Sequence, residues 1–305
     1  MKQIKTHFGA QTLILSFALL LALPVRVYQY LHVIDGTSGF YNNWFNPTVF
    51  GLYGLCLLVI ILLVVLSAKS GKQTIYAMPS GKKIGLGLSA LASSLAFLAA
   101  SAFNAVNAYG ILSGSRVTEQ LVLGNNVGKS TLLFTAIQVL FGVLSAVFML
   151  AYAVSCFSGK EQYKKVKILA ASPALWAVAR LMLGFSQTIS FRYVSELLFD
   201  LLTALFIAMF FVAFAKFSVG ALTARVQMRL FGYGMLSIFF CLLSAVPRYI
   251  MLLMGRSDVL YRSMNAYEAA DLILPIFVAC FIFAVAATKQ YKAVEEYGSS
   301  EEDAE

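Results

Sequence analysis

The chain has 305 residues, of which 60% are hydrophobic and only 12% are charged, and its formal net charge is +9. Soluble domains carry about 25% charged residues, so this composition excludes an ordinary water-soluble globular protein. The basic residues come in short groups between apolar runs, which argues against a nucleic-acid partner despite the positive charge.

Long uncharged runs predict helices that cross a membrane. No charged residue lies within 36–68, 84–115 or 130–159, and each run exceeds the roughly 20 apolar residues that span a bilayer as a helix. A helix in a soluble protein would also carry a polar stripe, which these runs lack. The predicted fold class is therefore all-α, a polytopic integral membrane protein with eight transmembrane helices at Phe8–Tyr28, Val49–Ala68, Ile84–Tyr109, Ser130–Phe157, Ile168–Thr188, Val194–Phe217, Leu230–Met254 and Glu268–Ala287.

The two ends of the chain differ in character. The first apolar run follows a positive start, as in a signal peptide, but Arg26 comes directly after it and no convincing small-residue cleavage site follows. We therefore expect a retained first helix within a single bundle over 1–290. Residues 291–305 are acidic and lack apolar periodicity, which predicts a disordered cytoplasmic tail.

Most of the 23 lysine and arginine residues fall on one side of the predicted bundle. They occupy the N-terminus, the connections after the second, fourth and sixth helices, and the segment after the eighth. Because positive residues favour the cytoplasmic side, both termini are predicted to lie inside, in a multi-pass protein of the plasma membrane. The opposite side carries mainly arginine, which suits a partly buried charge that holds a carboxylate or phosphate.

The outer ends of alternate helices resemble one another. They read PVRVY at 24–28, AVNAY at 105–109, AVARL at 177–181 and AVPRY at 245–249. This similarity favours four tandem helical hairpins, a common device in membrane folds. Chance is the alternative, because apolar helices resemble one another in composition.

Several charged residues lie inside the predicted helices near their outer ends. Arg180 and Asp200 are at similar depth on consecutive helices, and Arg248 and Asp271 repeat the arrangement, so we expect these pairs to meet. A charge in the hydrocarbon region costs about 2.5–3.5 kcal/mol, so such charges persist only if they pair or line water. We predict an outward-facing polar cluster that forms a substrate-binding site, built from Arg26, Arg180, Glu196, Asp200, Arg248, Glu268 and Asp271.

Two acids on one helix face repel each other unless a cation lies between them. Glu196 and Asp200 are four residues apart, and Glu268 and Asp271 are three apart, so each pair shares a face. An arginine beside each pair would balance the charge. The structural alternative is that these pairs only hold the helices together, or that the arginines extend to the lipid headgroups.

Two further segments have a distinctive composition. The first outer loop, Gly39–Thr48, contains four aromatic residues and is typical of an aromatic belt at the headgroups, although a lid over an outer cavity is an alternative. The segment Gly85–Ala105 is rich in glycine, alanine and serine, which predicts close packing in the centre of the bundle.

Motifs for catalysis or cofactor binding are not found. The segment GNNVGKST at 124–131 has Leu123 where a phosphate-binding loop requires its first glycine, and no strand precedes it. The four cysteines have no metal-ligand spacing, and there are only two histidines. We therefore expect no metal and no cofactor, and an enzyme is the weakest of the broad classes.

These observations favour a transporter, or a substrate-binding membrane component, for a small anionic solute. A second hypothesis is a non-catalytic subunit or scaffold of a larger membrane complex, whose lysine-rich inner loops contact membrane or cytosolic proteins. A third is a membrane enzyme that acts on lipid. In each case the lipid bilayer surrounds the protein. The sequence does not specify the solute, its direction of movement or the energy source.

Overall fold

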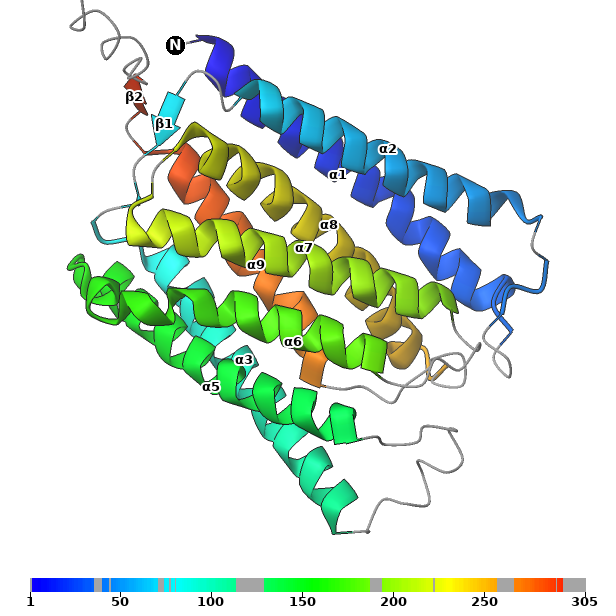
Figure 1. Cartoon of the computed structure of the whole chain (residues 1–305). Helices are drawn as coiled ribbons and strands as arrows, with labels where there is room; N and C mark the ends of the chain where they lie inside the picture. Colours follow the sequence, from blue (N-terminus) through cyan, green and yellow to red (C-terminus); the bar gives the residue numbers. More distant parts are fainter. Residues whose placement is uncertain are drawn as a thin grey trace, which may run out of the picture.

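The computed structural model describes residues 2–35, 40–43, 45–70, 74–76, 78–79, 81–113, 129–186, 194–221, 223–256, 266–288 and 290–292. Within these residues, eight helical segments are long and apolar enough to cross a membrane, as predicted. The main helices, shown in Figure 1, are α1 Lys2–His32, α2 Pro47–Ser70, α3 Ile84–Leu112, α5 Lys129–Ser158, α6 Ser172–Ser186, α7 Val194–Val219, α8 Ala224–Leu253 and α9 Ala266–Ala286.

The fifth membrane segment differs from its prediction. Instead of one helix over Ile168–Thr188, a 3-10 helix, η1 (Gln162–Ala171), leads into α6. Pro173 lies in the first turn of α6, where its missing N–H removes no helical hydrogen bond. The predicted end, Thr188, lies outside the described residues.

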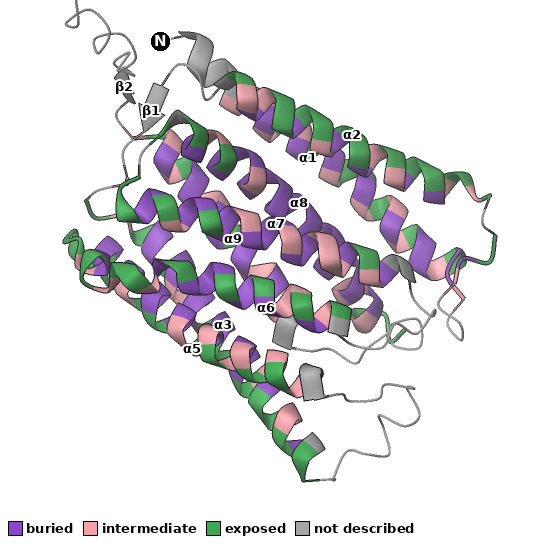
Figure 2. Cartoon of the chain, in the orientation of Figure 1, coloured by how far each residue is buried: buried purple, intermediate pink, exposed green. Residues whose placement is uncertain are grey.

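The outer surface of the bundle is apolar. On α1, Leu13, Phe17 and Leu20 are exposed by 69%, 62% and 69%, and their spacing of four and three residues places them on one helix face. Figure 2 shows exposed residues along α2 and α5 as well, whereas α8 is largely buried. Contiguous exposed apolar faces are unfavourable in water and favourable against lipid chains, so the surface agrees with a multi-pass membrane protein.

Helix α8 lies at the centre of the bundle. It packs against α1, α2, α7 and α9, whereas α3 packs mainly against α5 and α9. In Figure 1, α1 and α2 lie on one side of α7, α8 and α9, and α3, α5 and α6 lie on the other. The expectation that the small residues of α3 place this helix in the centre was therefore wrong.

Those small residues instead bring α3 close to α5. The Ser94 hydroxyl donates a hydrogen bond of 2.8 Å to the backbone oxygen of Ala146 across the interface. A Cβ atom at Gly142 would lie 2.0 Å from Ser101 Oγ and 3.1 Å from Trp176 Cδ1. Small residues thus permit close backbone approach without requiring a central position.

We expect Gly142→Ala to lower the free energy of unfolding by about 1–3 kcal/mol, because the added methyl group overpacks this interface. Thermal unfolding in detergent micelles measures the change. Gly51→Ala on α2 is the matched control, since a Cβ there has nothing within 4 Å. The double variant Gly142→Ala/Ser101→Ala should recover part of the loss, and an equally stable Gly142→Ala single variant would contradict the packing.

A short sheet connects two distant segments at the end of the bundle opposite the predicted site. Strand β1 (Thr74–Tyr76) pairs antiparallel with β2 (Gln290–Lys292). The predicted acidic tail therefore begins within a strand, and its remainder, 293–305, lies outside the described residues. The loop 124–128 also lies outside them.

Each consecutive pair of helices packs together. The pairs are α1 with α2, α3 with α5, α6 with α7, and α8 with α9. The parallel tandem repeat and the orientation in the membrane stay predictions.

Candidate functional site

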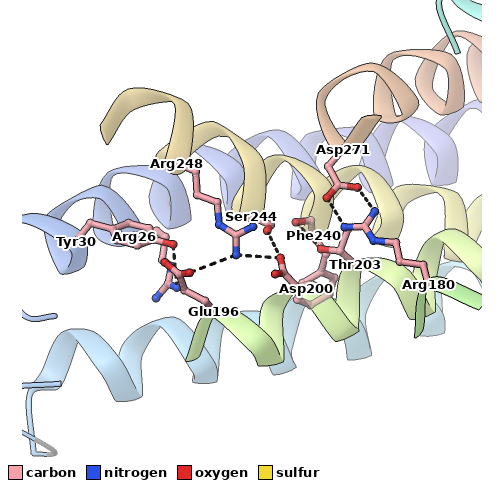
Figure 3. Close-up of polar contacts among 10 residues, drawn as sticks. All are labelled: Arg26, Tyr30, Arg180, Glu196, Asp200, Thr203, Phe240, Ser244, Arg248 and Asp271. Carbon is pink, nitrogen blue, oxygen red and sulfur yellow. Dashed lines mark hydrogen bonds and ion pairs between the residues drawn. The ribbon is translucent and has the colours of Figure 1, made fainter. Parts of the chain in front are cut away.

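Charged side chains from five helices lie near one end of the bundle (Figure 3). The arginines come from the C-terminal halves of α1, α6 and α8, and the acids come from the first two turns of α7 and α9. Helices that alternate in direction bring these ends together. The residues are Arg26 on α1, Arg180 on α6, Glu196 and Asp200 on α7, Arg248 on α8, and Asp271 on α9.

The shortest ion pair of this cluster joins α6 to α9. Arg180 Nη1 lies 2.5 Å from Asp271 Oδ1, and Nη2 lies 2.6 Å from Oδ2. The Asp271 side chain is 1% exposed. The Trp176 ring centroid lies 5.9 Å from the guanidinium carbon and covers part of it. Two parallel hydrogen bonds of this kind fix both the position and the orientation of the arginine and aspartate side chains relative to each other.

Arg248 lies between the two acids of α7. Its Nη2 atom is 3.0 Å from Asp200 Oδ1 and 3.7 Å from Glu196 Oε2. Ser244, one turn earlier on α8, donates a hydrogen bond of 2.9 Å to the same Asp200 oxygen. Asp200 is 28% exposed, whereas Glu196 is 3% exposed. Asp200 is therefore the most accessible acid of the cluster.

Arg26 has a different environment, built from neutral groups. Its Nη1 donates to Gln29 Oε1 at 3.0 Å and lies 3.5 Å from the Tyr41 hydroxyl, and its Nη2 lies 3.4 Å from the Tyr30 hydroxyl. The rings of Tyr30 and Phe199 each lie 4.7 Å from the guanidinium carbon. The side chain is fully buried at 1% exposure. Aromatic faces stabilise a buried cation, although less than an ion pair does.

The six charged groups form an electroneutral set. Arg180 and Asp271 balance each other, and Arg248 balances one of the two acids on α7. The remaining negative charge is balanced by Arg26, to which Glu196 is linked through Tyr30, because the Tyr30 hydroxyl also hydrogen-bonds to the Glu196 carboxylate. Burial is tolerable for such a set because no net charge is left in a low-dielectric region.

The structure brings the predicted residues together but with different partners. Arg180 pairs with Asp271 rather than Asp200, and Arg248 pairs with Asp200 and Glu196 rather than Asp271. The depth of each charge follows from its position along the helix, but the direction in which it points depends on how neighbouring helices rotate. The predicted pairing was therefore wrong. The side chain of Glu268 lies outside the described residues.

The sequence interpretation missed the neutral groups of the site. Tyr30 is four residues after Arg26, and Ser244 is four before Arg248, so helical spacing was an available signal for both. Tyr41 belongs to the loop predicted as an aromatic belt, but its side chain is only 9% exposed and reaches the guanidinium of Arg26. Its hydroxyl is also 3.2 Å from that of Tyr53.

No family model, curated protein or solved structure matches this chain. The chemistry of the site must therefore be inferred from its own geometry. Among the described residues, no group of three or more His, Cys, Asp or Glu side chains is placed to hold a metal ion.

Proposed function

We propose that this protein is a membrane transporter, or the substrate-binding membrane component of one, for a small anionic solute. The observation that supports this is the cluster of buried arginines and acids, in which Arg26 is held by neutral groups and Asp200 is partly exposed. Ionisable side chains inside membrane helices are costly and are typical of substrate and ion pathways.

The residues have separate roles in this proposal. Arg180 and Asp271 form a closed pair that holds α6 to α9, because both oxygens of the acid are engaged. Arg248 with Glu196 and Asp200 forms the part that rearranges, since one of the two ion pairs that Arg248 makes with α7 is long at 3.7 Å. Arg26 supplies the positive charge for the solute.

The scaffold hypothesis is supported by the Arg180–Asp271 pair, which is a sufficient reason by itself for two buried charges. Charge balance with Glu196 accounts for the burial of Arg26, but a scaffold would not require its hydrogen bonds to go to neutral oxygens instead of a carboxylate, which is the reason for preferring transport.

The expected result for the purified protein is a saturable rise in unfolding temperature with one or more small anions. The panel is chloride, nitrate, phosphate, acetate and lactate, compared at constant ionic strength with a bulky sulfonate as the balancing anion. An anion present at 100 times its Kd would add about 2.7 kcal/mol of stability. Equal effects of all five anions, or none, would argue against a binding site. Uptake of the active anion into proteoliposomes then tests transport.

The proposed orientation places the lysine-rich end in the cytoplasm and the charged cluster toward the outside. Lys160 and Arg256 are both exposed and lie at opposite ends of the bundle. In intact cells, a membrane-impermeant maleimide should label Arg256→Cys, and it should label Lys160→Cys only after permeabilisation. The unsubstituted protein is the control, because its four cysteines lie within helices, buried or half-buried. The reverse labelling pattern would invert the topology.

A further inference from the structure

The hydrogen bonds of Arg26 mark it as different from the other arginines of the cluster. Arg180 and Arg248 each form an ion pair, whereas Arg26 forms none with a carboxylate of the described residues. Its hydrogen bonds go to one amide oxygen and two phenolic hydroxyls. Neutral oxygens are weaker acceptors for a guanidinium than a carboxylate is. A carboxylate anion would therefore be a better hydrogen-bond acceptor for Arg26 than these neutral oxygens are.

The groups around Arg26 are able to bind such an anion. The rings of Tyr30 and Phe199 each lie 4.7 Å from the guanidinium carbon, and the N–H groups of the guanidinium are directed at oxygen acceptors. The Tyr41 and Tyr53 hydroxyls lie 3.2 Å apart, so one donates to the other, and the hydroxyl that accepts this bond keeps its own O–H to donate to an anion. A planar guanidinium edge with phenolic donors matches the two oxygens of a carboxylate.

The charge balance of the cluster sets a condition on binding. The excess negative charge of the acids on α7 is already balanced by Arg26 through Tyr30. A bound anion that takes over the guanidinium would leave one uncompensated negative charge in a buried region. That negative charge must be neutralised. A proton that binds to one of the acids neutralises it and, unlike a metal cation, needs no additional space.

Glu196 is the acid best placed to receive this proton. It faces Arg248 on α8 at 3.7 Å and Tyr30 on α1, and it shares its helix face with Asp200. Asp200 is held more firmly, by Arg248 at 3.0 Å and by Ser244 at 2.9 Å. Protonation of Glu196 breaks the longer contact and leaves the shorter one intact.

We infer that Arg26, Tyr30, Tyr41 and Tyr53 form the binding site for a small monocarboxylate, and that one proton from solvent binds to Glu196 with each anion. This inference rests on the proposed transport function and names its substrate class and coupling ion. A single arginine balances a single negative charge, which favours a monovalent carboxylate over inorganic phosphate, whose average charge at neutral pH exceeds one negative charge.

The experiment measures binding of lactate and of inorganic phosphate to the full chain in micelles, together with proton uptake from weakly buffered solution by an indicator dye. The unsubstituted protein should take up one proton per lactate, and its Kd should rise about tenfold for each pH unit, since binding and protonation are reciprocally linked. Glu196→Gln resembles the protonated acid, so it should bind lactate with no proton uptake and little pH dependence.

A second set of variants tests the role of Arg26. Arg26→Gln/Glu196→Gln keeps the cluster electroneutral, so it should fold and yet lose lactate binding by at least tenfold. Lys164→Gln removes an exposed charge from the lysine-rich end and should bind normally. Lactate binding without proton uptake, unchanged binding by the double variant, or tighter binding of phosphate would overturn this inference while leaving an anion transporter. No binding of any anion in the panel would instead overturn the proposed function.

Discussion

Replacement of Asp271 by asparagine is expected to lower the free energy of unfolding by about 3–5 kcal/mol. The reason is that Arg180 would keep its charge and lose its counter-charge, while the asparagine NH2 group would take the place of one of the two acceptors at 2.5 and 2.6 Å, in a region where Asp271 is 1% exposed. Unfolding of the purified protein by a denaturing detergent, followed by circular dichroism, measures the change.

Two comparisons make this prediction specific. Arg180→Met/Asp271→Leu removes both charges and should recover most of the stability, because well-packed apolar residues replace a buried pair at little cost. Glu161→Gln removes the partner of Lys164 in an exposed pair and should cost about 0–1 kcal/mol. A small effect of Asp271→Asn, similar to that of Glu161→Gln, would show that the buried pair is not formed.

Replacement of Arg248 by methionine should also cost about 3–5 kcal/mol, for the opposite reason. Glu196 and Asp200 are four residues apart on one helix, and without Arg248 the buried Glu196 and the partly exposed Asp200 repel each other. Arg248→Lys should cost less, because it keeps the charge, although a single ammonium reaches two acids less well than a guanidinium fork.

The matched control for this variant is Arg256→Met. Arg256 follows α8 and is exposed, so its replacement should change stability by no more than about 0.5 kcal/mol. The measurement is the same detergent-induced unfolding. If Arg248→Met and Arg256→Met proved equally stable, Arg248 would not be the cation that holds the acids of α7.

The number of helices long and apolar enough to cross a membrane was predictable because it depends on local properties. Uncharged runs longer than about 20 residues permit few structures other than a spanning helix. The error at the fifth segment also has a local cause. The stretch before Pro173 carries several lysines and forms a 3-10 helix, η1, which apolar periodicity does not detect.

The membership of the charged cluster was also largely predictable, but its contacts were not. A rise of about 1.5 Å per residue gives the depth of Arg180, Asp200 and Asp271 without any tertiary information. Which acid each arginine meets depends on the rotation of each helix and on its neighbours. Consecutive helices were assumed to share their charges, whereas the Arg180–Asp271 pair joins α6 to α9.

The small residues of α3 illustrate the same division. Their composition correctly indicated close packing, as the contact of Ser94 with Ala146 shows. It contained no information on which helix is central, and that position belongs to α8, whose surface is apolar and aromatic on several sides.

The sequence by itself determined that this chain forms apolar helices and that charges lie near one end of them, because both properties are read along one dimension. Only the tertiary structure decided that Arg26 is enclosed by aromatic rings and neutral oxygens while Arg180 and Arg248 are paired with acids. The physical reason is that a buried charge selects its partners by direction and distance across helix interfaces, and these are set by side-chain packing between segments far apart in the chain.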